Sequence, residues 1–172
     1  MDQLGARRSP STSTKAVYGV EDQWAATLAR GGRIDFFGSM LSIPMERRFG
    51  DLESVRRYVA AVTALPSVRV EFPAMPPLAV RERRGQTQAH YEPEALVIAI
   101  PVGQTWALRE TVVLHEIAHH ASCSQEAWDG DWHGVRFRAA MCSLVRIVLG
   151  DEAALLLRSG YEEAGLATVA SS

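Results

Sequence analysis

Cysteine is scarce in this chain. The 172 residues contain only two, Cys123 and Cys142. Two thiols cannot form the disulfide framework that small secreted domains use in place of a large core. The composition therefore favours a reducing compartment, and we expect Cys142 to lie in the core face of a helix.

Long apolar runs are also missing. No stretch of 18 apolar residues occurs in the sequence, and a helix that spans a membrane would need about that many. Residues 1–15 are rich in serine and threonine and lack the apolar segment of a signal peptide. We therefore expect a cytoplasmic protein without a membrane partner.

Neither sign of charge dominates. The formal net charge of −2 gives no overall attraction to nucleic acid. Basic residues form two clusters, one at Arg81, Arg83 and Arg84 and one at Arg7, Arg8 and Lys15. Both are more typical of solvated surface than of a phosphate-binding track, so nucleic acid is the weaker of the candidate partners.

The chain does contain enough apolar sequence for one core. Hydrophobic residues make up 47% of it, and its length is that of a single domain. We predict one folded domain over residues 16–166, with a flexible arm at residues 1–15 and a flexible tail at residues 167–172.

The apolar periodicity predicts an α+β fold. Helical spacing indicates helices over residues 16–30, 51–65, 133–149 and 151–166, the last interrupted near Gly160. Strand patterns occur over residues 33–43, 68–72, 78–83, 87–91 and 95–100. The polar segment 87–91 is typical of an edge strand, and the apolar run 95–100 is typical of a buried one.

Two of the five histidines lie in one short motif. Residues 115–119 read HEIAH, in a helical run from Trp106 that contains neither glycine nor proline. On a helix, His115 and His119 lie about 40° apart and one turn along, so both imidazoles can reach one metal ion. A catalytic zinc site usually has three protein ligands and an open fourth position. A third ligand is therefore expected.

The neighbours of the motif rank low as third ligand. His120 is rotated about 100° from His119 on a regular helix, and it is expected to lie behind the ligands or at the surface. Cys123 also falls on this helix and is not favoured. A metzincin would need glycine and histidine at the positions that Ser122 and Gln125 occupy, so that pattern is excluded.

The loop after the motif helix offers better candidates. Asp129 and Asp131 can bind a metal, but a Trp/Gly/Asp-rich loop more often uses such carboxylates in turns. His133 opens the next predicted helix. A histidine in the first turn of a helix packed against the motif helix can reach the same ion, so His133 ranks first.

The HEIAH sequence, followed after a short loop by HGVRF at residues 133–137, resembles the SprT-like zinc metalloproteases. The chain is most similar to the small actinobacterial metallohydrolases of that type, and the similarity is strong over residues 105–150. The resemblance implies a zincin-like domain, with a small mixed sheet packed on the HExxH helix and on a following ligand-bearing helix. It also implies Zn²⁺, metal ligands at His115, His119 and His133, and Glu116 as the catalytic carboxylate.

The chain departs from this family in one respect. Many SprT-like proteins carry a zinc ribbon that needs four cysteines, and this chain has two. The family's association with DNA-bound protein substrates is therefore not carried over. The ligand types favour zinc without excluding iron, cobalt or manganese.

The expected chemistry follows from these residues. Three neutral imidazoles leave zinc its full charge, which lowers the pKa of a bound water, and Glu116 can take the water proton and later pass it to the leaving nitrogen. A second donor to the oxyanion is expected, with His120, Arg136, Tyr91 and Tyr161 as candidates. Trp128 and Trp132 either wall the cleft or pack the loop onto the core.

Two functions remain open at this stage. The first is a zinc metallopeptidase, with Ala89, His90 and Tyr91 as the edge-strand rim that holds an extended protein or peptide substrate. The second is a non-catalytic, zinc-stabilised module that associates with peptide or DNA. An unliganded Glu116 favours the first, because a structural site does not need it. The sequence does not reveal the oligomeric state.

Overall fold

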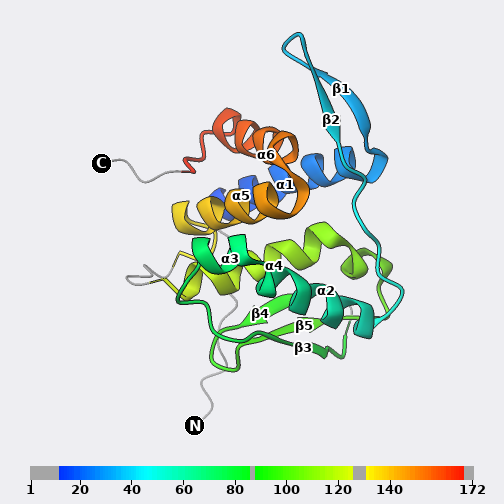
Figure 1. Ribbon diagram of the computed structural model, residues 1–172, viewed down its shortest axis with the longest axis vertical. Coiled ribbons are helices and arrows are strands. Elements are labelled where there is room, and N and C mark those ends of the chain that lie inside the picture. Colours follow the sequence, from blue (N-terminus) through cyan, green and yellow to red (C-terminus); the bar gives the residue numbers. More distant parts are fainter. Residues whose placement is uncertain (1–11, 86–87, 126–130, 169–172) are drawn as a thin grey trace.

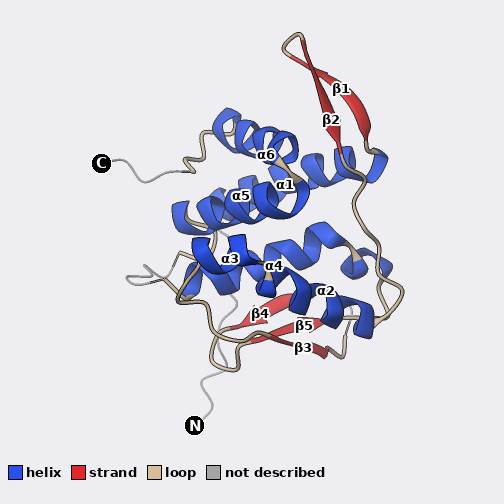
Figure 2. Cartoon of the chain, in the orientation of Figure 1, coloured by secondary structure: helices blue, strands red, loops and turns tan. Residues whose placement is uncertain are grey.

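The computed structural model describes residues 12–85, 88–125 and 131–168. They form a mixed α+β fold, shown in Figures 1 and 2. The first half of the described chain contains α1 (Thr12–Arg30), β1 (Gly32–Phe36), β2 (Ser39–Ile43), α2 (Leu52–Ala64), α3 (Pro66–Glu71) and β3 (Ala79–Glu82). The second half contains β4 (His90–Glu92), β5 (Val97–Ile100), the 3₁₀ helix η1 (Thr105–Leu108), α4 (Glu110–Cys123), α5 (Val135–Leu149) and α6 (Asp151–Glu163).

A small mixed sheet forms one layer of the molecule. Its strand order is β3-β5-β4, in which β5 is parallel to β3 and antiparallel to β4. The predictions of a buried strand within residues 95–100 and of an edge strand near residues 87–91 are confirmed, although β4 begins only at His90. Ile98 and Ile100 of the central strand are fully buried, as their continuous apolar sequence requires.

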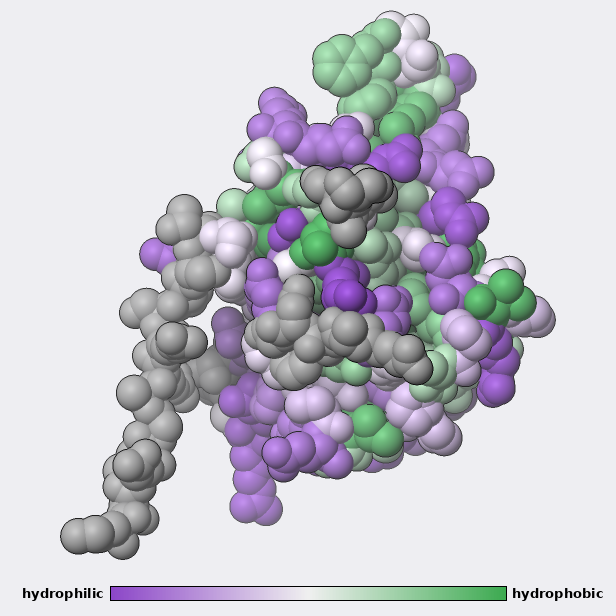
Figure 3. Space-filling view, turned by 90° about the vertical axis from the view of Figure 1, so that its left-hand side faces the viewer, coloured by the Kyte–Doolittle hydropathy of each residue, from purple (hydrophilic) through white to green (hydrophobic). Residues whose placement is uncertain are grey.

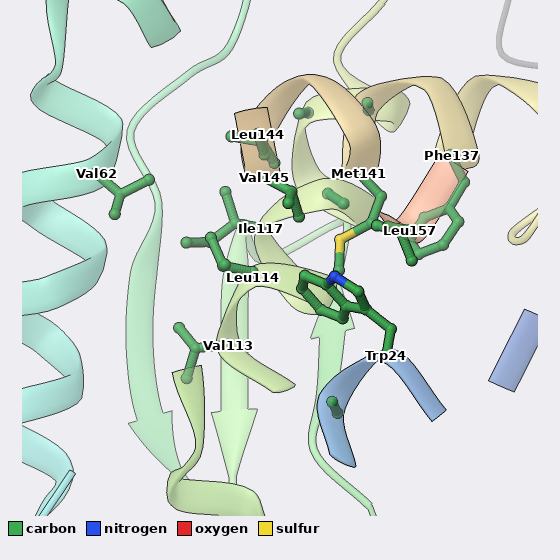
Figure 4. Close-up of a cluster of buried hydrophobic side chains, with 14 of the residues drawn as sticks. Trp24, Val62, Val113, Leu114, Ile117, Phe137, Met141, Leu144, Val145 and Leu157 are labelled. Atoms are coloured by element: carbon green, nitrogen blue, oxygen red, sulfur yellow. The ribbon is translucent and has the colours of Figure 1, made fainter. Parts of the chain in front are cut away.

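Helix α4 lies between the sheet and a layer made of α1, α5 and α6 (Figure 1). Of its 14 residues, only Val112 and Cys123 are not buried. Side chains from α1, α2, α4, α5 and α6 meet in the core (Figure 4). The indole N–H of Trp24 donates to the Ala153 carbonyl at 3.0 Å, which ties α1 to α6 inside this core.

The helix predicted over residues 51–65 is confirmed as α2. The N-cap Asp51 accepts a hydrogen bond from the Ser54 N–H at 2.7 Å, and Val55, Val59 and Val62 form the buried stripe. None of the helices in the described part of the chain combines the length and the apolar character that crossing a membrane requires.

The single strand predicted over residues 33–43 is wrong, because the segment is a two-stranded hairpin. Phe37 and Gly38 connect β1 to β2 with φ values of 53° and 82°. Two successive positive φ values form the tight turn whose twist matches antiparallel strands. Gly38 was the available signal, but the phenylalanine before it is not a usual turn residue.

The strand predicted over residues 68–72 is also wrong, because this segment belongs to helix α3. Val68 and Val70 are β-branched residues of the kind that favour strands. Val68 is fully buried while Val70 is 81% exposed. Pro66 occupies the first helical turn, where its fixed φ favours a helix and its missing N–H costs nothing.

The boundaries of the N-terminal helix and of the last helix also differ from the predictions. Helix α1 begins at Thr12, so the last four residues of the predicted arm are helical. Helix α6 continues through Gly160 without interruption. A Cβ atom at this position would lie 2.9 Å from Val20 Cγ1, so the glycine permits close packing of α6 on α1.

The C-terminal tail and the two ligand-bearing segments differ as well. Ala167 and Thr168 of the predicted tail pack on the domain, with the Ala167 carbonyl accepting from Arg138 Nε at 2.7 Å. The motif helix begins at Glu110, after η1 and an extended Arg109, rather than near Trp106. Helix α5 begins at Val135, so His133 lies just before the helix and not in its first turn.

Candidate metal centre

Three buried imidazoles converge where α4 meets the start of α5. The Nε2 atom of His115 lies 3.1 Å from Nε2 of His119 and 3.3 Å from Nε2 of His133. All three candidate ligand atoms lie within 4.8 Å of one another. The prediction that these three histidines form a group able to hold a metal ion is therefore confirmed. The identity of the metal does not follow from the geometry.

The segment around His133 is held by its own backbone contacts. Asp131 Oδ1 accepts from the His133 N–H at 3.2 Å, and Arg138 Nη1 donates to the His133 carbonyl at 2.5 Å. A Cβ atom at Gly134 would lie 2.9 Å from the Asp131 carboxylate, so a larger residue here would displace the Asp131 side chain. Asp131 is thus a turn carboxylate, as its surroundings in the sequence indicated.

Phe137 packs beneath all three imidazoles. Its ring centroid lies 4.8 Å from that of His115, 4.4 Å from that of His119 and 5.0 Å from that of His133. Three residues of the HGVRF segment therefore have a clear physical role. The histidine points its Nε2 at the cluster, the glycine closes the turn, and the phenylalanine supports the three rings.

A carboxylate from α1 orients the first histidine. His115 Nδ1–H donates to Glu21 Oε2 at 2.6 Å, and the Tyr161 hydroxyl donates to Glu21 Oε1 at 2.5 Å. This hydrogen bond holds a proton of His115 on Nδ1, so Nε2, which faces the cluster, is the nitrogen that can bind a metal. A carboxylate behind a metal-binding histidine has this role in many metal sites.

Sequence reasoning missed Glu21, although a signal was present. Val17, Glu21, Trp24 and Leu28 share one face of α1, and all four are buried. A carboxylate within an apolar stripe needs a buried partner. The partner itself lies 94 residues away, so the sequence offers no means of naming His115.

The buried surroundings act differently on the three imidazoles. Burial lowers the pKa of His115, but the charge and hydrogen bond of Glu21 outweigh it and bring the pKa to about 8. Burial and the nearby charge of His115 lower the pKa of His133 to about 4 and that of His119 well below its usual value. His119 and His133 are therefore neutral near pH 7, as metal ligands must be.

Glu116 is buried beside this cluster without belonging to it. Its Oε2 atom has no hydrogen-bond partner among the described residues, and neither has His119 Nδ1. Burial raises the pKa of Glu116 to about 7, although the charge of His115 and a hydrogen bond from the Tyr91 backbone act in the opposite direction. An unpaired buried carboxylate is costly in a fold that has no use for it.

Two cavities flank Glu116 and form an open cleft. The larger, of about 310 Å³, extends past Glu21, Trp106 and Arg109. The smaller, of about 170 Å³, is bounded by two of the histidines and by the edge-strand rim; its lining is Tyr18, Gln88, Ala89, His90, Tyr91, Glu116, His119, Trp132 and His133. The predicted rim at residues 89–91 therefore does lie beside the histidine cluster.

Tyr18 of α1 is a second residue that sequence reasoning missed. Its ring stacks on His115, with centroids 5.5 Å apart and an interplanar angle of 20°, and its edge faces His133 at 5.0 Å. Tyr18 lines both cavities. Burial, with the charges of Glu116 and Glu21, raises its pKa to about 12, so the hydroxyl keeps its proton. No pattern in the sequence distinguishes this tyrosine.

His120 serves the scaffold and is not part of the cluster. It is fully buried, its Nε2 lies 2.9 Å from the Pro76 carbonyl, and its Nδ1 lies 2.9 Å from the Tyr91 hydroxyl. Nε2–H therefore donates to the carbonyl and Nδ1 accepts from the tyrosine. The hydrogen bond between His120 and Tyr91 connects α4 to the edge strand. Both ring nitrogens of His120 are thus engaged outside the cluster, in agreement with the expectation that it is not a ligand.

The remaining candidate oxyanion donors, metal ligands and cleft-wall residues differ in whether they lie at the cleft. The Tyr161 hydroxyl is engaged with Glu21, and neither Tyr161 nor Arg136 lines either cavity. Cys123 does not join the described metal-binding group. Trp132 lies with its ring edge-on to His119 at 5.6 Å and forms part of the cleft wall. Asp129 and Trp128 lie outside the described residues.

Together these residues define an α+β protein with a buried three-histidine centre that could hold a metal ion. Comparisons with protein-family models, with curated proteins and with solved structures found no match for the chain. The interpretation of the centre therefore depends on its geometry and on the chemistry of its donor atoms.

Proposed function

We propose that the chain is a zinc metallopeptidase of the zincin type. One observation carries the proposal: an unpaired, buried Glu116 carboxylate lies in an open cleft beside three converging imidazole nitrogens. A structural metal site is closed and does not need a free carboxylate. The resemblance of residues 115–119 and 133–137 to SprT-like metalloproteases supports the same assignment.

The donor set suits zinc. Three neutral nitrogen ligands with an open side are typical of catalytic zinc sites, and His115, His119 and His133 would hold the ion. When bound, zinc would supply a Lewis acid that polarises the substrate carbonyl and lowers the pKa of water. The three candidate ligand atoms lie within 4.8 Å of one another, which is close enough for them to share one ion.

Glu116 is the proposed general base. Its pKa of about 7 means that the carboxylate can accept a proton from the attacking water and afterwards release it to the leaving amine nitrogen. The Tyr91 backbone hydrogen bond holds one side of the carboxylate against the edge strand. The Oε2 atom of the carboxylate has no hydrogen-bond partner among the described residues.

Tyr18 is the proposed donor to the oxyanion. It is a neutral phenol that borders both halves of the cleft and packs against two of the histidines. A donor held there by packing can stabilise charge that develops on the carbonyl oxygen. Among the tyrosines that we considered from the sequence, Tyr91 and Tyr161 have hydroxyls already bonded to His120 and Glu21.

The proposed substrate is an extended peptide segment. Strand β4 is an edge of the sheet, and its neighbours Gln88 and Ala89 border both cavities. An extended chain can add to such an edge through main-chain hydrogen bonds. The larger cavity, bordered by Trp24, Trp106 and Val112, would then receive a bulky apolar side chain next to the scissile bond.

A search for cleaved peptides tests the proposal. Zinc-loaded wild-type protein, the Glu116→Gln variant and the Glu163→Gln variant would each be incubated with a proteome-derived peptide mixture. We expect cleavage by the wild type and by Glu163→Gln, whose carboxylate is exposed on α6. Glu116→Gln should bind zinc and lose cleavage by a factor of about 10² or more.

Two outcomes would reject the enzyme. Cleavage by Glu116→Gln at the wild-type rate would show that Glu116 is not the general base. Zinc-dependent retention of peptides by wild type and Glu116→Gln alike, without cleavage by either, would favour the non-catalytic binding module instead.

A further inference from the structure

The β1–β2 hairpin presents an apolar surface that the proposed peptidase does not use. It projects from the helical body in Figure 1, and hydrophobic side chains gather over it at the top of Figure 3. Phe37 at its tip is 93% exposed, Met40 is 50% exposed and Met45 just after it is 67% exposed. Phe37 also adopts a positive φ of 53°, which bulky residues rarely do. A tip that only met water would gain from a polar residue or glycine here.

One edge of the hairpin is open. The register places Phe36 opposite Ser39 across the two-residue turn, so this pair and alternate pairs from it exchange the hydrogen bonds of the ladder. The backbone N–H and C=O groups of Arg33 and Asp35 consequently point away from β2. In the part of the chain that the structure describes, no backbone or side-chain hydrogen bond covers these outward groups.

The other edge is not open in the same way. On β2 the outward N–H of Ser42 donates to Glu152 Oε2 of α6 at 2.9 Å. The inner face of the hairpin is also used, because Leu41 and Ile43 are buried in the core. Of the two edges, that of β1 is therefore the more open, and this edge and the tip are the surfaces that a partner can reach.

We propose that β1 pairs antiparallel with β1 of a second copy of this chain, centred on Ile34. In this register Arg33 of each copy lies opposite Asp35 of the other. The outward N–H and C=O groups of both residues then meet, and they can exchange main-chain hydrogen bonds. Opposite charges face each other twice across the twofold axis, which stabilises this register over one shifted by a single residue.

The same register covers the exposed apolar residues. Phe36 of one copy lies opposite Gly32 of the other. Phe37 and Gly31 both leave the strand with positive φ, so the register brings the tip of one copy near the Gly31 turn of the other without pairing the two residues. Gly31 is already close to Met45, since a Cβ atom at Gly31 would lie 3.1 Å from Met45 Cβ. The tip of each copy therefore contacts the exposed Met45 of the other. Four apolar side chains leave water in one symmetric contact.

The oligomeric state in solution tests this dimer. Five paired residues on each side make a small interface, so the dimer should be weak. Sedimentation equilibrium of the full chain should therefore cover protein concentrations from about 1 µM to about 1 mM. We expect a reversible monomer–dimer equilibrium. Arg33→Asp places two like-charge pairs in the contact and should weaken dimerisation at least about tenfold. Arg69→Asp, the same charge change on exposed α3, should leave dimerisation unchanged.

A mixing experiment separates this contact from general damage to the hairpin. Asp35→Arg should also prevent self-association, because it places positive charges opposite each other. An equimolar mixture of Arg33→Asp and Asp35→Arg has opposite charges at both cross-strand positions, and it should form a heterodimer with about the wild-type affinity. Phe37→Gly should weaken the wild-type dimer while the fold remains stable, since glycine suits the positive φ.

Three results would overturn the proposal. The first is a wild-type chain that stays monomeric over the whole concentration range. The second is an Arg33→Asp variant that dimerises as well as the wild type. The third is a mixture of the two charge variants that stays monomeric although each variant retains the circular dichroism spectrum of the wild type.

Discussion

Glu21 links the N-terminal helix to the histidine cluster. Its two oxygens are both engaged, one with His115 and the other with Tyr161, and the side chain is almost entirely buried. The proton on His115 Nδ1 and the direction of its Nε2 lone pair both depend on this contact. A single carboxylate thus connects α1, α4 and α6 at the candidate metal centre.

Replacing Glu21 should weaken metal binding without removing a ligand. In Glu21→Gln the amide cannot match the charge-assisted hydrogen bond to His115, so we expect zinc affinity to fall about 10- to 100-fold. Competition with a chromogenic chelator measures the affinity. Asp22→Asn, an exposed neighbour on the same helix, should change it little. Equal zinc affinity in wild type and Glu21→Gln would show that the contact does not orient the ligand.

Replacing Tyr18 and replacing Tyr91 by phenylalanine should have different effects on catalysis. If Tyr18 donates to the oxyanion, Tyr18→Phe should lower kcat by about 10²-fold on a verified substrate and leave zinc content unchanged. The hydroxyl of Tyr91 is bonded to His120, so Tyr91→Phe should act mainly on stability. Steady-state kinetics with parallel thermal denaturation distinguishes the two effects. A larger loss of kcat in Tyr91→Phe than in Tyr18→Phe would instead indicate Tyr91 as the donor to the oxyanion.

At the scale of helices and strands, Gly160 shows how packing can outweigh propensity. Alanine normally stabilises a helix interior over glycine by about 1 kcal/mol. At Gly160 the added Cβ would lie 2.9 Å from Val20 Cγ1, and overpacking typically costs about 1–3 kcal/mol. We therefore expect Gly160→Ala to be destabilising by up to about 2 kcal/mol in denaturant unfolding.

Gly19 provides the matched control for this prediction. It lies within α1, and a Cβ atom there would meet nothing within 4 Å. Gly19→Ala should consequently raise the free energy of unfolding by up to about 1 kcal/mol. The Val20→Ala, Gly160→Ala double variant should recover part of the loss. A stabilising Gly160→Ala would mean that α1 and α6 are less closely packed than the structure indicates.

The sequence predicted elements best where one residue spacing determined the outcome. The i, i+4 spacing of His115 and His119 requires a helix for a shared metal ion, and the apolar run at residues 95–100 requires burial. It failed at residues 68–72, where Pro66 at the start of a short helix outweighed the strand preference of the valines. It also failed at residues 33–43, where a turn with an unusual phenylalanine interrupts the apparent strand.

The residues of the candidate site also include some that the sequence predicted and some that it did not. The HExxH spacing grouped His115, Glu116 and His119, and His133 was added from its place before the next predicted helix and from the family resemblance. Tyr18 and Glu21 lie about a hundred residues earlier, and only the packing of α1 against α4 brings them to the cluster. Contacts of that separation depend on the tertiary fold and leave no local pattern.

On the scale of the whole molecule, the candidate metal centre lies between the sheet and the helical layer. The mixed sheet supplies the edge strand, α4 and the start of α5 supply the imidazoles, and the N-terminal and C-terminal helices supply Glu21 and its partner Tyr161. A metal that binds only the folded state would stabilise all of these contacts together. Removal of the metal should therefore lower Tm as well as activity.

Metal content of the purified chain and of matched histidine variants is the sharpest test of the three-histidine centre. Metal-free protein would be loaded with zinc, freed of excess and analysed for zinc per chain. We expect about one zinc per chain for wild type, near-complete loss for His133→Ala, and full content for His90→Ala, a histidine on the cleft rim outside the cluster. Full zinc content in a folded His133→Ala variant would contradict the three-histidine centre.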